Sequence, residues 1–167
     1  MKQLAYLFVL LVAVIGLSSW LQKGDVSKVL NLGPSQTPTT YTQVLKVKNT
    51  TVMVEIVATP EKLAQGLSGR DGLAENIGML FVVAQNTRPT FWMKDMKFPI
   101  DIIWINDNMV VGIEKNVPIP QDPNNTSSLE RYSPSTGVDY VLEVESGFTQ
   151  KNSIAPGDEV ELPQTLR

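Results

Sequence analysis

The chain has 167 residues, of which 43% are hydrophobic and 19% are charged, a balance typical of one globular domain. It contains no cysteine and no histidine, which excludes disulfides, thiol nucleophiles, histidine-based catalytic triads and Cys/His zinc sites. The formal net charge is −3, but residues 43–166 alone hold ten Lys/Arg against sixteen Asp/Glu. Such an acidic segment is a poor binder of the phosphate backbone, so we expect no nucleic-acid partner. We also expect no metal and no other cofactor.

Residues 1–21 contain an almost uninterrupted apolar run that extends from Leu4 to Leu21. A run of about this length lies at the boundary between a signal peptide and a membrane-spanning helix. It has no clear A-x-A cleavage site, and Trp20 stands where interfacial aromatic residues are found. We therefore predict an N-terminal hydrophobic helix that anchors the chain in a membrane, with the domain on the extracytoplasmic side. The alternative is a cleaved signal, which would leave the protein secreted or periplasmic.

Residues 22–42 are rich in Gly, Pro, Ser, Gln and Thr and include the sequence N-L-G-P-S-Q-T-P-T-T. This composition without periodicity is typical of a flexible linker. We therefore predict a linker over residues 22–42, one β domain over residues 43–162 and a short tail over residues 163–167.

The first half of the predicted domain contains two strands and one short helix. Residues 51–58 alternate between apolar and polar side chains, which predicts a strand. Thr59-Pro60-Glu61 then predicts a helix start, because it combines an N-cap hydroxyl, a proline in the first turn and an acid near the positive helix end. Gly66 and Gly69 limit this helix to a few turns. The apolar run from Met79 to Val83 has the length of a strand.

The second half is predicted to be almost entirely β. Residues 98–105 form an apolar strand, and the Asn106-Asp107-Asn108 turn predicts that residues 109–114 return as its hairpin partner. Residues 138–145 alternate, which places Glu143 on the polar face of that strand. A helical or turn segment near residues 147–152 precedes a last strand at residues 159–162. We predict a mainly β fold, a compact single-domain sandwich or barrel with one or two short helices.

Asp101 stands inside the apolar strand at residues 100–105. Alternation places it on the same face as Ile103 and Ile105, so its carboxylate is expected to be buried. A buried carboxylate is costly unless it is paired or hydrogen-bonded, which predicts a cationic or donor partner nearby. Arg70 and Lys94 are the candidate cations. An internal pair that locks the sheet is the structural explanation for this residue.

Five short motifs occur along residues 66–143, and their order and spelling resemble one family. They are G-L-S-G-R from Gly66, G-M-L-F from Gly78, F-W-M-K from Phe91, P-I-D-I-I-W-I from Pro99 and Y-V-L-E from Tyr140. Together with the closing I-A-P-G-D-E-V-E-L, they make residues 44–162 resemble the bacterial and archaeal DUF192 family. The resemblance implies a compact, mainly β domain, often behind a signal or anchor segment, and no particular activity. Asp95 stands where members often carry Asn, which weakens an anion-binding role for the motif around Lys94.

The polar and aromatic members of these motifs are the candidate site. We predict that Arg70, Trp92, Lys94 and Asp101 converge on a small polar or carbohydrate ligand, with Arg70 as a bidentate clamp and Trp92 as a stacking face. The favoured function is a small-ligand binding or interaction module of the cell envelope. The first alternative is an enzyme, a hydrolase or transferase that modifies an envelope polymer. The second alternative is a structural accessory subunit without a ligand.

Overall fold

The computed structural model describes residues 43–122 and 125–167. The predicted anchor at residues 1–21 and the predicted linker at residues 22–42 lie outside the described residues. In the described part of the chain no helix is long and apolar enough to cross a membrane. This part is mainly β with two short α-helices, which confirms the predicted class.

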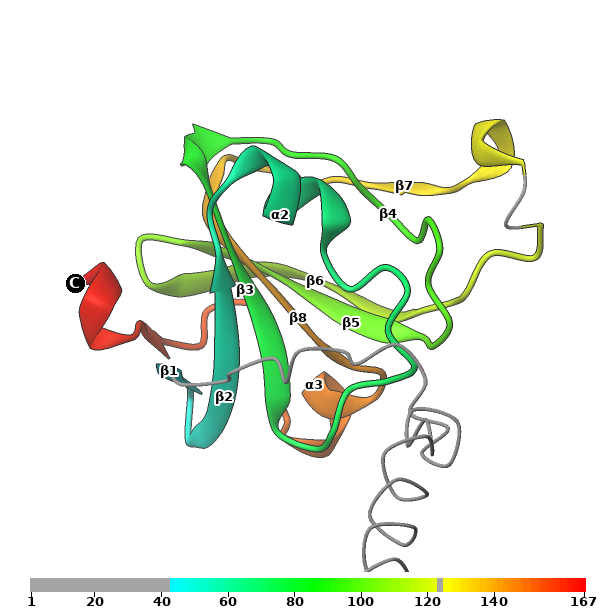
Figure 1. Cartoon of the computed structure of the whole chain (residues 1–167). Coiled ribbons are helices and arrows are strands. Elements are labelled where there is room, and N and C mark those ends of the chain that lie inside the picture. The colour runs from blue at the N-terminus through cyan, green and yellow to red at the C-terminus, as the bar shows by residue number, and fades with distance from the viewer. Residues whose placement is uncertain (1–42, 123–124) are drawn as a thin grey trace, which may run out of the picture. The chain divides into compact units, whose positions relative to one another are not determined.

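Seven strands form one curled sheet, a half-barrel, in the order β6-β5-β8-β3-β2-β1-β9, and β4 and β7 form a separate two-stranded ribbon (Figure 1). In chain order the elements are β1 (Gln43–Val47), β2 (Thr50–Val57), α2 (Pro60–Gln65), β3 (Ile77–Thr87), β4 (Phe91–Trp92), β5 (Ile100–Asn106), β6 (Met109–Val117), the 3-10 helix η2 (Thr126–Ser128), β7 (Arg131–Tyr132), β8 (Val138–Glu145), α3 (Phe148–Lys151), β9 (Val160–Glu161) and the 3-10 helix η3 (Gln164–Leu166).

The helix α2 lies in the crossover between β2 and β3, which are parallel neighbours in the sheet. Parallel neighbours cannot be joined by a tight turn, so the chain has to pass over one face of the sheet. The predicted helix start is confirmed, because the Thr59 side chain accepts a hydrogen bond from the Lys62 backbone N–H at 3.4 Å. The helix ends at Gly66, whose φ of 50° lies in a region that other residues adopt only with strain.

Each face of the curled sheet carries its own apolar core. On one face the strands pack against α3 and the C-terminal segment, and this cluster includes Ile103, Leu142, Val144, Phe148 and Val160. On the other face they pack beneath α2 and the segment that contains β4, and this second cluster includes Leu67, Met79, Phe81, Met93, Met96, Ile102 and Val141. The strand β5, between β6 and β8, is buried along almost its whole length because its two faces contribute to the two cores. Its predicted alternation is confirmed.

The hairpin of β5 and β6 turns at Asp107 and Asn108, whose φ values of 47° and 61° are those expected of this turn sequence. The beginning of β6 then meets the segment before β9. Val110 donates its backbone N–H to the Asp158 carbonyl at 2.9 Å, and Val160 donates to the Asn108 carbonyl at 2.7 Å. The two edges of the sheet are therefore linked at one end.

The prediction that Glu143 lies on a polar face of its strand is wrong. β8 stands between β5 and β3 in the sheet, with Ile102 and Met79 as the register partners of Glu143. A strand in this position is covered on both faces, and Glu143 is only 6% exposed. Alternation distinguishes two faces correctly, but it identifies a solvent face only where one face is uncovered.

Candidate functional site

A cleft of about 370 Å³ opens between α2 and the β4–β7 ribbon, over the second core cluster. This volume is in the range of sites for small organic molecules. Residues of α2, of the loop after it, of β3 and of the ribbon form the walls. The lining residues are Leu63, Ala64, Gln65, Gly66, Leu67, Ser68, Phe81, Val83, Pro89, Thr90, Phe91, Trp92, Met96, Arg131 and Glu143.

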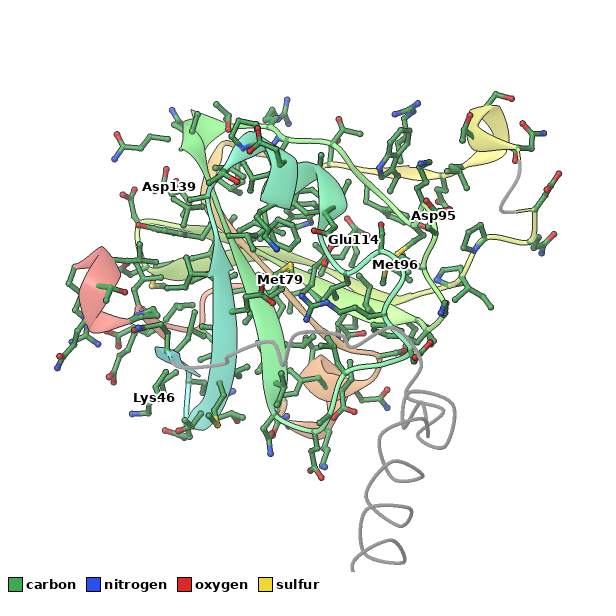
Figure 2. All side chains as sticks on the ribbon, viewed as in Figure 1. Lys46, Met79, Asp95, Met96, Glu114 and Asp139 are labelled. Carbon is green, nitrogen blue, oxygen red and sulfur yellow. The ribbon has the colours of Figure 1, made fainter. Side chains whose placement is uncertain are left out.

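The loop after α2 is fastened to the segment after β4 by two hydrogen bonds. The Ser68 hydroxyl donates to the Lys94 carbonyl at 2.7 Å, and the Gly69 N–H donates to the Asp95 carbonyl at 3.0 Å. Asp95 and Met96, which follow β4 in the chain, are both labelled in Figure 2. These bonds connect one wall of the cleft to the other, so the cleft is held by the fold and not by its own lining contacts alone.

The aromatic side chains of β4 have different positions. Phe91 packs edge-to-face against Phe81 at 5.0 Å and against Trp104 at 5.6 Å, which seats β4 on the sheet. Trp92 is 41% exposed and lies under the guanidinium of Arg131, 5.0 Å from the ring centre. Trp92 and Arg131 are register partners in the ribbon, so the pairing of β4 with β7 produces this cation–π contact at the rim.

Glu143 is the acidic residue among the described side chains that line the cleft. It comes from β8 of the sheet, and no hydrogen bond is among the causes that shift the pKa of its carboxyl. Burial raises the pKa of its carboxyl to about 8, against the opposing effect of the Arg70 charge. Near neutral pH this carboxyl is therefore mostly protonated in the folded protein.

Arg70 acts on Glu143 through its charge. Its guanidinium pairs with the Glu55 carboxylate at 2.6 Å, and both side chains are largely buried. Arg70 does not line the cleft, and its position after α2 places it beside the cleft. Arg70, the predicted clamp residue, is therefore the ion-pair partner of Glu55, and its charge acts on Glu143 in the cleft.

Of the four predicted site residues, Trp92 lines the cleft, and Arg70, Lys94 and Asp101 do not. The ammonium of Lys94 lies 3.2 Å from the Asp95 carboxylate at an exposed position. The residue contributes to the cleft through its backbone, since its carbonyl accepts the Ser68 hydrogen bond.

Asp101 is fully buried, as predicted, but its partners are hydrogen-bond donors and not Arg70 or Lys94. Its Oδ1 accepts from the N–H groups of Asn116 at 2.8 Å and Gly147 at 3.2 Å. Its Oδ2 accepts from the N–H of Thr149 at 2.9 Å and from the Thr149 hydroxyl at 2.6 Å. The three bonds from Gly147 and Thr149 attach the beginning of α3 to β5 on the face of the first core cluster, opposite the cleft, and the bond from Asn116 comes from β6.

Neither Glu143 nor Arg131 is among the four residues predicted for the site. The signal for Glu143 was present in the run V-L-E-V at residues 141–144. Apolar residues there occupy both alternating faces of the strand, which indicates a strand buried on both sides around one acid. Arg131 gave no comparable signal, because its contact with Trp92 depends on a pairing between segments far apart in the chain. In the part of the chain that the structure describes, no three acidic side chains gather as metal ligands.

A comparison with curated proteins finds no match. Among solved structures, a protein of unknown function from Novosphingobium aromaticivorans DSM 12444 is similar, with 27% sequence identity and a TM-score of 0.64, over 71% of this chain and 83% of that chain. A protein from Sinorhizobium meliloti 1021, described as a "putative transcription regulator", has 25% identity and a TM-score of 0.64, over 74% of this chain and 95% of that chain.

The family model for DUF192, described as "Uncharacterized ACR", matches residues 43–162. The match begins at the first residue of β1 and ends just after β9, so it spans the curled sheet, the ribbon and the cleft. The chain therefore belongs to the DUF192 family.

Proposed function

We propose that this domain binds a small organic ligand in the cleft between α2 and the β4–β7 ribbon. The observation that carries the proposal is Glu143, a carboxyl group 6% exposed that lines an otherwise largely apolar cleft and whose pKa is raised by burial, with no hydrogen bond among the causes. Buried polar groups in native proteins nearly always have a partner, and a carboxyl whose pKa is strongly shifted inside a cleft is typical of a functional site. A ligand that hydrogen-bonds to Glu143 supplies such a partner.

The positions of the family motifs support the same site. Four of the five motifs on which the resemblance rests contribute side chains to the cleft, through Leu67, Phe81, Trp92 and Glu143 among others. Those motifs are far apart in the chain and belong to different elements. A shared packing role explains Phe81 and Leu67, but it does not explain an acid in the same cavity.

The four predicted residues have different roles in this proposal. Trp92 contacts the ligand from the rim and offers a flat face to an aromatic, aliphatic or sugar ring. Arg70 is a positioning residue, because its charge adjusts the proton affinity of Glu143. Lys94 holds the loop after α2 through its carbonyl, and Asp101 holds α3 on the opposite face.

Nucleic acid is not the ligand that we propose, although one similar structure carries a transcription-related description. Residues 43–166 have an excess of six acidic over basic side chains, counted from sixteen Asp/Glu and ten Lys/Arg. That excess repels a phosphate backbone. The proposed setting is the cell envelope, with residues 1–21 as the anchor and the cleft outside the cytoplasm.

The second candidate function is an enzyme of the hydrolase or transferase type with Glu143 as general acid. The observation that favours it is the raised pKa of Glu143, since a general acid works best when its pKa lies near the working pH. A two-carboxylate mechanism requires a second acid across the cleft. Among the described residues Glu143 is the one acid that lines it, so this candidate ranks below ligand binding.

The test of ligand binding is a thermal-unfolding screen of the full-length chain, followed by intrinsic tryptophan fluorescence. The library contains amines, alcohols, carboxylic acids, amino acids, sugars and cell-wall fragments. Ala64 lies on the exposed side of α2 and lines the cleft, so Ala64→Trp fills the cleft without changing the core. Lys62→Trp is the matched control, because Lys62 is exposed on the same helix and does not line the cleft.

We expect at least one library compound to raise the unfolding temperature of the parent and of Lys62→Trp, and to leave Ala64→Trp unchanged. A compound that stabilises Ala64→Trp equally binds elsewhere and would contradict the proposed site. The enzyme candidate predicts in addition that Glu143→Gln abolishes turnover of a bound compound while its affinity stays within about threefold.

A further inference from the structure

The charged groups near Glu143 come from the loop after α2, from β2 and from β7. From the loop after α2, Arg70 faces it but is paired with Glu55 at 2.6 Å. From β7, Arg131 lies at the rim, where it is exposed and 5.0 Å above the Trp92 ring. From β3 and β5, the neighbouring residues are Met79 and Ile102, which have no charge.

A charge at the buried floor of the cleft, where Glu143 lies, interacts more strongly with a ligand than a charge at the exposed rim. Solvent screens the exposed Arg131, whereas Glu143 is 6% exposed and sits among apolar side chains. Arg70 and Glu55 together are neutral, so ionisation of Glu143 gives the floor a net negative charge. The cleft therefore favours a ligand that brings a positive charge together with N–H donors to that point.

The walls of the cleft determine which kind of group carries the positive charge of the ligand. The walls present hydrocarbon, aromatic and thioether surface, so burial of the apolar part of a ligand against them is favourable. The side chains concerned are Leu63, Leu67, Phe81, Val83 and Met96. A bare metal ion is a poor fit, because it needs several oxygen ligands and Glu143 is the one acid among the described lining residues. An ammonium group on a short apolar body complements both the acidic floor at Glu143 and the apolar walls.

We infer that the cleft selects a small organic amine whose ammonium group donates hydrogen bonds to the Glu143 carboxylate while its apolar body packs between α2 and β4. This inference rests on the proposed ligand-binding function and specifies the chemical class of the ligand. Glu143 is the specificity-determining residue, and Trp92 with Phe91 supplies the aromatic wall.

Amine binding has a proton signature. The carboxyl of Glu143 has a pKa of about 8, so at pH near 7 it holds a proton in the free protein. An ammonium pairs with the ionised carboxylate, which requires that proton to leave. The complex therefore forms with release of close to one proton per ligand at neutral pH, and amine affinity increases as the pH rises toward about 8.

The experiment compares 2-phenylethylamine with 2-phenylethanol by isothermal titration calorimetry on the full-length chain. The two probes have the same apolar body and differ in the ammonium or hydroxyl group. The variants are Glu143→Gln, which keeps the shape and removes the charge, and Glu145→Gln as matched control. Glu145 lies two residues along the same strand and does not line the cleft. Titrations in two buffers of different ionisation enthalpy measure the proton release.

We expect the amine to bind at least about tenfold more tightly than the alcohol, since a charge-assisted hydrogen bond is stronger than a neutral one. Glu143→Gln should remove this preference and the proton release, and Glu145→Gln should retain both. The release is measured on the unmodified protein, so it remains decisive if Glu143→Gln does not fold.

Three results overturn the inference. They are equal binding of the amine and the alcohol, amine binding without proton release, and no binding of either probe. If the amine fails but another library compound is blocked by Ala64→Trp, the ligand-binding function stands and the amine class falls. If no compound is blocked by Ala64→Trp, both fall together.

Discussion

At the level of single residues, two buried carboxylates on neighbouring strands have opposite environments. Asp101 on β5 accepts four hydrogen bonds from Asn116, Gly147 and Thr149, whereas burial without a compensating hydrogen bond raises the pKa of Glu143 on β8. The two side chains point to opposite faces of the sheet, one toward α3 and the other toward the cleft. Asp101 therefore stabilises the fold, whereas Glu143 costs stability that the ligand we propose would recover.

The cost of Glu143 should be visible in the pH dependence of stability. Its pKa is about 8 in the folded protein and near the ordinary 4.5 in the unfolded chain, so the folded state holds one more proton between these values. The free energy of unfolding should therefore fall as the pH rises from about 4.5 to about 8, by up to about 1.4 kcal/mol per pH unit, and level off above. Urea titrations of the parent and of Glu143→Gln across this range measure the difference.

In Glu143→Gln this contribution is absent, so the difference between the two proteins isolates it from other titrating groups. We expect the variant to be the more stable protein at pH 8 and above. Parallel pH profiles for the two proteins would contradict the buried, proton-holding state of Glu143.

Asp101→Ala should destabilise the domain by about 3 kcal/mol or more, because it leaves several donors without their acceptor. Thr149→Val removes one of the four hydrogen bonds, and we expect a loss of about 1 kcal/mol. Chemical denaturation measures both, and hydrogen exchange at α3 should increase in step. A loss below about 1 kcal/mol in Asp101→Ala would show that the three bonds from Gly147 and Thr149 do not hold α3 to the sheet.

At the level of elements, the cleft depends on the β4–β7 ribbon as much as on the sheet. Phe91 anchors β4 to the core, and the Trp92–Arg131 contact joins the two strands of the ribbon at the rim. The ribbon is short, with two residues in each strand, so it has few backbone hydrogen bonds of its own. Its position rests on these side chains and on the Ser68 and Gly69 hydrogen bonds.

Arg131→Ala should therefore weaken ligand binding more than it weakens the fold. An exposed cation–π contact contributes about 0.5–1 kcal/mol, so the free energy of unfolding should change by about 1 kcal/mol or less. We expect the affinity for a cleft ligand to fall about three- to tenfold as Trp92 loses its fixed position. Arg88→Ala is the matched control, since Arg88 is exposed and does not line the cleft. Equal effects on binding in both variants would indicate a general charge effect instead.

At the level of the whole molecule, the last residues of the chain complete the fold. β9 pairs with β1, while the residues around it bond to the beginning of β6, at the other edge of the sheet. Val160 and Leu162 are 1% and 5% exposed in the first core cluster. The C-terminal segment therefore joins two edges that would otherwise expose unpaired backbone groups.

A chain that ends at Gly157 lacks both side chains and should lose roughly 3–6 kcal/mol of stability from their missing apolar burial alone. A chain that ends at Pro163 keeps β9 and removes η3, and we expect it to lose about 1 kcal/mol. Urea denaturation of the two truncated chains against the parent measures the contrast. Similar stability of both would mean that β9 does not close the sheet.

The membrane anchor is a proposal about the whole chain, and the absence of cysteine makes it testable. Ser135→Cys introduces a single thiol at an exposed loop position. A membrane-impermeant maleimide should label this thiol in intact cells, and the labelled chain should stay in the membrane fraction. N-terminal sequencing distinguishes the alternatives, because a mature start beyond Leu21 indicates a cleaved signal.

Local sequence patterns were sufficient to predict the main strands, the helix start at Thr59, the Asp-Asn hairpin turn and the burial of Asp101. These features follow from side-chain periodicity, capping and φ preferences, which act over a few residues. The order of the motifs also predicted the family, which the family model confirms.

Tertiary contacts, in contrast, determined which charged side chains pair with one another and which of them lines the cleft. Arg70 pairs with Glu55 and not with Asp101, because the crossover through α2 returns the chain over β2. Glu143 lines a cleft because β8 is covered on both sides and α2 and the ribbon lie over one of its faces. Strand order and layer covering depend on contacts between segments that are distant in sequence, and local patterns do not encode those contacts.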